Sequence, residues 1–344
     1  MNNKKELKTV SYKCSSCGGT MRFDPQSQAL KCTSCVSTQQ LLKEHSNLKH
    51  NLSSEAKEEK HQKWAEETKI LRCNNCGAEI ILNRLEFSGV CPYCGSSYVI
   101  ETSLLPDFVP DRVIPFAFDE VEAEKRFKLQ LKRKFYVPAS CKKNVKPENI
   151  KGIYIPAFSF DANIDATYSG TLRRSHDNEV SYFHISGKHS SRQKDVLIEN
   201  SSKLTQESLK KILPYDLESA NKFSEGFVLG YVVEHYEDAF NVCLNKAQKE
   251  MQNRVKEEIL SKYVHDGVRE FNLKCNFSNQ KYVYSIVPIY QMNFMYKKKK
   301  FNVLMNGQTG KIGGKFPTSV LKVMLTVLGW ILLIALIVFI SSLS

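Results

Sequence analysis

Eight of the eleven cysteines occur in two copies of one spacing that suits a tetrahedral metal ion. Each copy consists of two cysteines separated by two residues, a stretch of fourteen residues, and a second such pair. The copies comprise Cys14, Cys17, Cys32 and Cys35, and then Cys73, Cys76, Cys91 and Cys94. Because four thiolates fill the coordination shell of zinc, this spacing predicts two structural zinc ions and leaves no open position for catalysis.

Disulfide bonds in a secreted protein are the alternative use of these cysteines, but the N-terminal segment MNNKKELKTV contains no apolar stretch typical of a signal peptide. Metal binding would also stabilise each four-cysteine segment, because the segment has too few apolar residues for a hydrophobic core of its own. Glycines, which permit φ > 0, follow three of the four cysteine pairs at Gly18, Gly77 and Gly95, and Val36 follows the fourth. We therefore expect two zinc ribbons with structural Zn2+, and the spacing leaves iron open as another metal.

The C-terminal part of the chain carries a second chemical signal, an apolar segment. Val323 to Ile340 are eighteen residues without a charge. Residues 320–340 would form a helix of about 31 Å, close to the hydrocarbon thickness of a bilayer. A buried helix of a soluble protein is the alternative. Because only four residues follow Ile340, we expect a single-pass, C-terminal tail anchor.

The charges around this segment predict its orientation. Lys311, Lys315 and Lys322 precede the apolar residues, and no basic residue follows them. The positive-inside rule then places the bulk of the chain in the cytoplasm. A reducing compartment agrees with cysteines that bind metal as thiolates.

Other residues that could do chemistry do not assemble into a catalytic pattern. The segment NGQTGKIGGK has the wrong spacing for a phosphate-binding loop and reads as a hairpin turn. Asp161 and Asp165 lie on one side of a predicted strand and could bind a cation, although a solvent-facing role is the commoner one. We therefore expect a protein that is not an enzyme.

The elements that must position these residues fall into five segments. We predict a first zinc ribbon at 1–36, a polar helical linker at 37–70, a second zinc ribbon at 71–104, an α+β domain at 105–316 and a transmembrane helix at 320–340. Within the α+β domain, apolar residues at every fourth position predict helices at 119–135 and 238–263. Alternating patterns predict strands at 153–168 and 282–296, and 226–236 reads as a buried strand. The order strand, helix, strand pair occurs twice, which suggests a duplicated, mostly antiparallel domain.

The composition excludes a largely disordered or multi-span membrane protein, since the chain of 344 residues has 42% hydrophobic and 25% charged residues. A net charge of +13 is compatible with nucleic acid or an anionic membrane as partner. Exposed basic and aromatic residues of the ribbons would carry nucleic-acid binding. The candidates are Arg22 and Phe23 in the first ribbon and Arg72, Arg84, Phe87 and Tyr93 in the second.

The order of motifs along the chain resembles a known family. Tandem four-cysteine ribbons followed by IPFAFDE, YIPAFSFDANIDATYSG, PIYQMNFMY and NGQTGKIGG are similar to the bacterial TFIIB-type zinc-ribbon-containing proteins. Members of that family are sometimes labelled as primosomal replication proteins or helicases. The resemblance covers most of residues 70–316 and implies a zinc-ribbon protein, often with membrane segments. The sequence contains no phosphate-binding loop that would support a helicase activity.

These observations lead to two functional hypotheses. The first is a membrane-anchored cytoplasmic adaptor without enzymatic activity, whose two zinc ribbons recognise an unknown protein partner. The alternative is a nucleic-acid-binding protein, tethered to the membrane by residues 320–340 and linked to replication or transcription. Steep salt dependence of nucleic-acid binding would distinguish the second hypothesis from the first.

Overall fold

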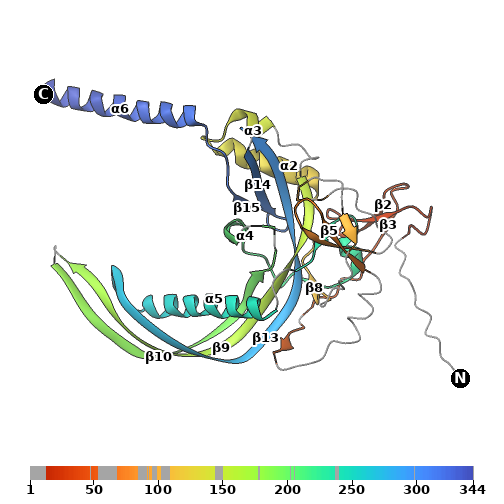
Figure 1. Cartoon of the computed structure of the whole chain (residues 1–344), viewed down its shortest axis with the longest axis horizontal. Coiled ribbons are helices and arrows are strands. Elements are labelled where there is room, and N and C mark those ends of the chain that lie inside the picture. The colour runs from red at the N-terminus through yellow and green to blue at the C-terminus, as the bar shows by residue number, and fades with distance from the viewer. Residues whose placement is uncertain are drawn as a thin grey trace.

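The molecule, a computed structural model, combines two β-sheets with helices in a mixed α+β fold (Figure 1). The structure describes residues 13–46, 48–52, 68–83, 91, 93–94, 99–101, 109–143, 150–176, 179–201, 203–204, 206–236, 240–297 and 299–343. A small sheet has three strands, and a large sheet connects twelve. The large sheet pairs strands from both halves of the chain, so the second cysteine segment and the α+β region share one sheet.

The first cysteine segment folds into the small antiparallel sheet. Its strands are β1 (Met21–Asp24), β2 (Ala29–Cys32) and β3 (Thr38–Gln39). The second cysteine segment contributes β5 (Thr68–Cys73), β6 (Glu79–Asn83) and β7 (Val99–Glu101). β5 pairs with both of its neighbours, and β6 also pairs with β12 (Val232–Glu234). The second cysteine segment therefore forms one edge of the large sheet.

Three long strands dominate the large sheet: β9 (Ile150–His176), β10 (Glu179–Glu199) and β13 (Gly267–Tyr296). Shorter strands join them, namely β4 (His50–Asn51), β8 (Arg112–Val113), β11 (Asn221–Lys222), β14 (Lys299–Asn306) and β15 (Ile312–Gly314). Most pairs are antiparallel, as expected, and the parallel pairs are β12 with β9 and β13 with β8. The strands predicted at 153–168 and 282–296 are confirmed, and both are longer than the sequence pattern indicated.

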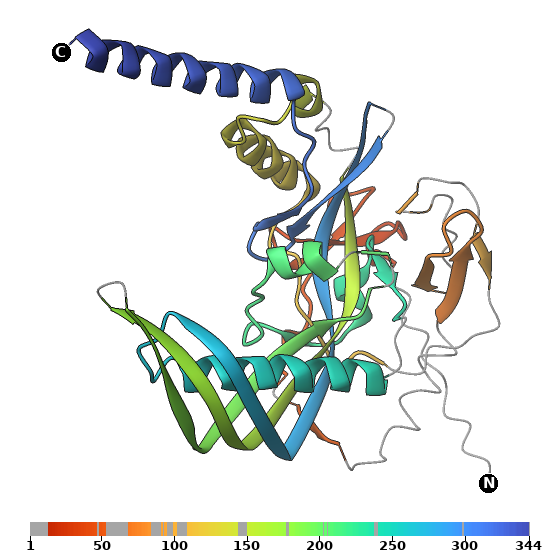
Figure 2. The same cartoon turned by 60° about the vertical axis from the view of Figure 1, so that its left-hand side comes forward.

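Beyond the body of the molecule, β9, β10 and β13 continue as a curved arm, with α5 (Phe240–Leu260) along its inner side (Figures 1 and 2). The pattern of β9 explains this packing, because alternate side chains such as Phe160 and Ile164 are buried beneath α5 while the intervening ones are polar. The helix buries Cys243, Ala247, Met251, Val255 and Ile259 against the arm. This spacing of four confirms the helix predicted at 238–263.

The helices at the other end of the body are α2 (Glu120–Arg133) and α3 (Ala139–Lys143). Asp119 caps α2, because the backbone N–H of Glu122 donates a hydrogen bond to Asp119 Oδ1 at 2.8 Å. Ala123, Phe127 and Leu131 form its buried stripe, so the helix predicted at 119–135 is confirmed. A further short helix, α4 (Gln206–Ile212), contacts β15. The chain ends in α6 (Val320–Leu343).

Two predictions about the elements differ from the structure. The segment 226–236 begins with a 3-10 turn, η2 (Glu225–Val228), and only β12 is a strand, because Gly230 with φ +88° interrupts an extended course. Since β12 is this short and pairs with the second ribbon, the predicted duplication is not confirmed. The described part of the linker, 37–46 and 48–52, contains the short strands β3 and β4 and no helix, and β4 pairs with β13. Residues 53–67 lie outside the described residues.

Candidate metal centres and a polar cleft

The eight predicted ligands form two separate clusters, each with four sulfur atoms within 4.8 Å of one another. In the first cluster the Sγ atoms of Cys14 and Cys35 are 3.5 Å apart, as are those of Cys17 and Cys32. Zinc bound to four sulfurs at about 2.3 Å has S···S edges of about 3.8 Å. A disulfide needs an S–S distance of about 2.05 Å, and all eight cysteines are free thiols. The first cluster therefore fits a tetrahedral metal ion.

The backbone around each first cysteine pair has the same hydrogen-bonded turn. Gly18 N–H donates to the carbonyl of Cys14 at 2.8 Å, and Gly77 N–H donates to the carbonyl of Cys73 at 2.8 Å. Both glycines have positive φ, +72° and +67°. In each of these turns the two cysteines of a pair therefore bring their sulfurs to the same cluster.

After the Cys32–Cys35 pair, where valine stands in place of glycine, the chain adopts the same backbone conformation. Val36 has φ +64°, which is unfavourable for a β-branched residue. The next residue supports the cluster, because Ser37 Oγ lies 2.9 Å from the Sγ of Cys14 and 3.0 Å from that of Cys35. The hydrogen bond from this hydroxyl is the main cause that lowers the pKa of Cys14 to about 5. A thiolate at this position is the form that binds a metal ion.

The second cluster is more sheltered than the first. The Sγ atoms of Cys73 and Cys94 are 3.6 Å apart, and those of Cys76 and Cys91 are 3.7 Å apart. Cys73 and Cys91 are buried, and the other two are half-buried. Its sulfur spacing matches the tetrahedral edge, so this cluster fits a metal ion as well.

A buried hydrogen-bond chain connects the second cluster to the large sheet. Tyr93, which lies between two of the ligands in sequence, donates its hydroxyl to Glu234 Oε2 at 2.6 Å. Ser201 donates to the other carboxylate oxygen of Glu234 at 2.9 Å. Burial raises the pKa of Tyr93 well above its usual value, so the phenol remains a donor. Sequence reasoning missed Glu234 because it comes from β12, far along the chain.

The residues predicted to form a nucleic-acid surface divide into two groups. Phe23 is 4% exposed and packs on Phe227 with ring centroids 5.5 Å apart, and Tyr93 is 5% exposed. Neither ring is available for stacking on a base. Arg22 and Arg72 are exposed. Arg84 and Phe87 lie outside the described residues.

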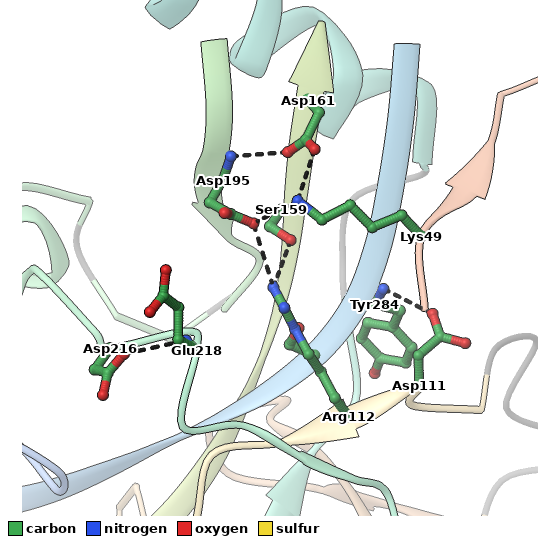
Figure 3. Close-up of polar contacts among 10 residues, drawn as sticks. Lys49, Asp111, Arg112, Ser159, Asp161, Asp195, Asp216, Glu218 and Tyr284 are labelled. Carbon is green, nitrogen blue, oxygen red and sulfur yellow. Dashed lines mark hydrogen bonds and ion pairs between the residues drawn. The ribbon is translucent and has the colours of Figure 1, made fainter. Parts of the chain in front are cut away.

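A polar cleft of about 580 Å³ lies where the arm joins the body. At its base, Arg112 is only 4% exposed and donates from Nε to Ser285 Oγ and from Nη2 to Ser159 Oγ, both at 2.8 Å. Asp195 Oδ1 is 3.9 Å from the same guanidinium group (Figure 3). The buried charge is thus compensated by hydroxyl groups and a carboxylate, as burial of an arginine requires.

Asp161, which the sequence suggested as a possible cation ligand, forms an ion pair with a lysine in the same cleft. Lys49 Nζ lies 2.6 Å from Asp161 Oδ2 and 3.1 Å from Asp195 Oδ1. Asp161 Oδ1 accepts a hydrogen bond from the backbone N–H of Asp195 at 2.9 Å. Asp165 is turned away toward Ser190, which donates to it at 2.7 Å. The two aspartates therefore do not share a site, and the Lys49 pairs fasten the linker to the arm.

One helix in the described part of the chain is long and apolar enough to cross a membrane, Val320–Ser341 with mean hydropathy 3.0, and none of it is buried in the protein. Its first turn is attached to the loop after α2. Ser319 N–H donates to the carbonyl of Tyr136 at 2.8 Å, and Lys322 Nζ donates to the carbonyls of Phe135 and Val137 at 2.8 and 3.1 Å. The helix that the sequence predicted at 320–340 is therefore present and free of protein cover.

Comparisons with known proteins give one relative of unknown role. No protein-family model matches the chain, so the resemblance to TFIIB-type zinc-ribbon proteins is not confirmed. No solved structure matches it either. The chain is 29% identical over 328 residues to the uncharacterized protein YdjG of Bacillus subtilis (strain 168), a match that covers 90% of this chain and 91% of that protein.

Proposed function

We propose that the chain is a membrane-anchored cytoplasmic adaptor in which two zinc ribbons form the recognition part and α6 the anchor. The observation that carries this proposal is that both cysteine clusters are joined by backbone hydrogen bonds to the part of the chain that leads into α6. β6 of the second ribbon pairs with β12, and Phe23 of the first ribbon donates its N–H to the carbonyl of Leu229 at 3.0 Å. Metal binding at either cluster therefore shapes a surface that is fixed relative to α6.

The chemistry of the clusters supports a structural role for zinc. Four thiolates complete the coordination shell, so the ion would hold β-strands together rather than activate water. Reduced thiols and the lysines before α6 both support a cytoplasmic location for the body, with α6 as a single-pass tail anchor. In each ribbon the metal would replace the apolar core that so short a segment lacks.

Two observations favour an adaptor over a nucleic-acid-binding protein. The ring of Phe23 is enclosed by the body, and that of Tyr93 is occupied by its contact with Glu234. Stacking of bases on exposed aromatic side chains is a main source of affinity for single strands. Of the candidates that the structure describes, Arg22 and Arg72 remain exposed, and two such arginines would give weak, salt-sensitive contacts with phosphates.

Metal analysis of the purified full chain tests the zinc sites. We expect two zinc ions per chain in the wild-type protein and one in the Cys91→Ser variant. Cys275→Ser is the matched control, because Cys275 lies on β13 outside both clusters and its loss should leave two ions bound. Iron in place of zinc, or loss of metal from the control, would contradict the proposal.

A titration of the full chain in detergent micelles with single- and double-stranded DNA and RNA tests the adaptor role. The adaptor predicts no micromolar binding at low salt. Binding with a steep log–log dependence on salt, weakened by Arg72→Glu and not by Lys249→Glu on α5, would favour the nucleic-acid alternative and overturn the adaptor. Both positions are exposed, so the charge change is the same and only its place differs.

A further inference from the structure

The body of the molecule has a strongly basic surface at the base of α6, which we name the basic face. It comprises the C-terminal half of α2, the following loop with α3, and the hairpin between β13 and β14. Residues 125–143 contain eight lysines and arginines and no acidic residue. Residues 282–344, from the part of β13 next to this hairpin to the C-terminus, contain seven lysines and no acidic residue. Lys125, Arg126 and Lys128 pair with Glu122 and Glu124 on α2, so the charges that characterise the basic face on this side are those of Lys132, Arg133, Lys134, Lys142 and Lys143.

Contacts along the chain fix the basic face next to the start of α6. Lys134 Nζ lies 4.6 Å from the ring centre of Phe316, three residues before the helix-capping Ser319. The loop carbonyls of Phe135 and Val137 accept hydrogen bonds from Lys322 in the first turn of α6. Wherever α6 enters a bilayer, residues 132–137 are thus beside the point of entry.

The hairpin belongs to the same end of the molecule. Tyr296 and Phe301 lie on its two strands with ring centroids 6.5 Å apart. Both pack against the core cluster that includes Leu131 of α2 and Cys141 of α3. Figure 2 shows α2, α3 and this end of β13 and β14 near the start of α6. Lys297 and Lys299 add two exposed charges there.

Apolar side chains are exposed among these charges. Leu129 is 57% exposed, Phe135 is 63% exposed and Tyr136 is 42% exposed. Solvent exposure of two adjacent aromatic rings is costly in water. Aromatic residues beside cationic ones are typical of the interface between headgroups and hydrocarbon.

We propose that the basic face binds the phosphate groups of anionic lipids, such as phosphatidylglycerol, and so holds the body flat against the membrane. This proposal rests on α6 being the membrane anchor. Lysine and arginine side chains near an anionic bilayer are attracted to it, and the attraction decays within a Debye length. The cations would contact lipid phosphates, while Phe135 and Tyr136 would enter the headgroup layer.

The shape of the molecule makes this orientation specific. In both views α6 and the arm leave the body on the same side (Figures 1 and 2). A bilayer perpendicular to α6 in that direction would also enclose the arm, whose outer side carries exposed polar residues such as Lys188 and Lys274. Such a position is excluded by the cost of burying charge in hydrocarbon. The bilayer therefore lies across the basic face, beside the first turn of α6.

Hydrogen exchange of the full chain in lipid nanodiscs tests the proposal, with phosphatidylcholine discs compared with discs that also contain phosphatidylglycerol. We expect amides of residues 129–143 and 296–301 to exchange about tenfold more slowly in the anionic discs, and high salt to reverse the effect. Amides at 179–186, on the arm, should be unaffected by lipid charge. Equal exchange in both kinds of disc, or protection of the arm instead, would overturn the proposal.

A charge-matched pair of variants sharpens the result. Lys132→Gln, Arg133→Gln and Lys134→Gln together should abolish the protection, whereas Lys188→Gln, Lys249→Gln and Lys274→Gln together should retain it. All six side chains are exposed, so neither set removes a buried partner. Incorporation into discs tests the role of α6 on its own. A chain that fails to incorporate contradicts α6 as a membrane anchor. A chain that incorporates but shows no lipid-dependent protection contradicts lipid binding by the basic face. Protection of the same amides by added DNA or RNA but not by anionic lipid would also overturn it.

Discussion

At the scale of single residues, the first cluster places a valine where the other described knuckles have glycine. Val36 has φ +64° and its side chain is 62% exposed, so no packing compensates the backbone strain. A left-handed conformation costs a non-glycine residue about 1–2 kcal/mol. The conformation persists because the neighbouring Cys35 and Ser37 are both held at the cluster.

Replacement of this valine by glycine should therefore stabilise the first ribbon. We expect Val36→Gly to raise the free energy of unfolding by about 1 kcal/mol, because relief of the strain exceeds the added chain entropy of glycine. Denaturant unfolding of the zinc-loaded chain measures this. Gly77→Val, at the equivalent turn of the second cluster where φ is +67°, should instead lower the free energy of unfolding. A destabilised Val36→Gly variant would show that the valine side chain has a role of its own.

A second residue makes stability depend on pH. Glu199, at the end of β10, is 3% exposed, and burial raises its pKa to about 7, while Lys210 partly opposes the shift. The folded state then binds a proton that the unfolded state has already lost between its ordinary pKa of 4.5 and about 7. The free energy of unfolding therefore falls as the pH rises through this window, by up to about 3 kcal/mol.

The Glu199→Gln variant removes this titration and keeps the shape of the side chain. Its stability relative to wild type should increase steadily from about pH 5 to about pH 7 and stay constant above that. Unfolding curves of both proteins at a series of pH values give the difference, which also cancels the loss of zinc in acid. A pH-independent difference would mean that Glu199 is ionised throughout in the folded state.

At the scale of elements, α2 depends on one side chain that serves two structures. Asp119 accepts the N–H of Glu122 with one carboxylate oxygen and the side-chain amide of Gln26 with the other, at 2.8 Å each. Gln26 belongs to the turn between β1 and β2. The cap of α2 is therefore also a link to the first ribbon.

Loss of this carboxylate should have a measurable and separable effect. Asp119→Ala should cost about 1 kcal/mol of stability, because an N-cap and an exposed hydrogen bond are both removed. Asp119→Asn is the control, since asparagine caps helices as well as aspartate does and should restore most of the loss. Thermal unfolding of the three proteins compares them. An equal loss in both variants would assign the effect to the charge rather than to the cap.

At the scale of the whole molecule, the second cysteine segment and the central strands meet in one large sheet, which leads in the described part of the chain to one exposed apolar helix. The second ribbon pairs with β12, β12 with β9, and β9 with β13, which leads directly through β14 and β15 to α6. Anchoring of α6 would therefore restrict the position of both metal clusters relative to the bilayer.

The anchor predicts a clear behaviour in cells. Expressed in a bacterial host, the full chain should stay in the membrane fraction after alkaline carbonate extraction, and a chain lacking residues 320–344 should be soluble. With the body on the cytoplasmic side, protease added to intact spheroplasts should not cleave it. A variant with the charges at Lys311 and Lys315 reversed is the control, because it removes the positive charges on which the predicted orientation depends. Cleavage of the wild-type body from outside would contradict the proposed topology.

The sequence alone determined the features that depend on local spacing. Four cysteines of the pattern CxxC-x14-CxxC come together because two tight turns need no long-range information. The apolar segment at 320–340 is long enough to span a bilayer by composition alone, and the stripe of α5 follows from the helical period. In each case the physical constraint acts over neighbouring residues.

Only the tertiary structure decided what distant strands bring together. The pairing of β6 with β12 makes the second cysteine segment part of the large sheet. Tyr93, which the sequence placed on the nucleic-acid surface, is buried and donates a hydrogen bond to Glu234. The cleft around Arg112 unites side chains from β8, β9 and β13, and the basic face unites α2 with the hairpin. Such contacts depend on strand order and register, which are set by packing across the whole sheet and leave no periodic signal in the sequence.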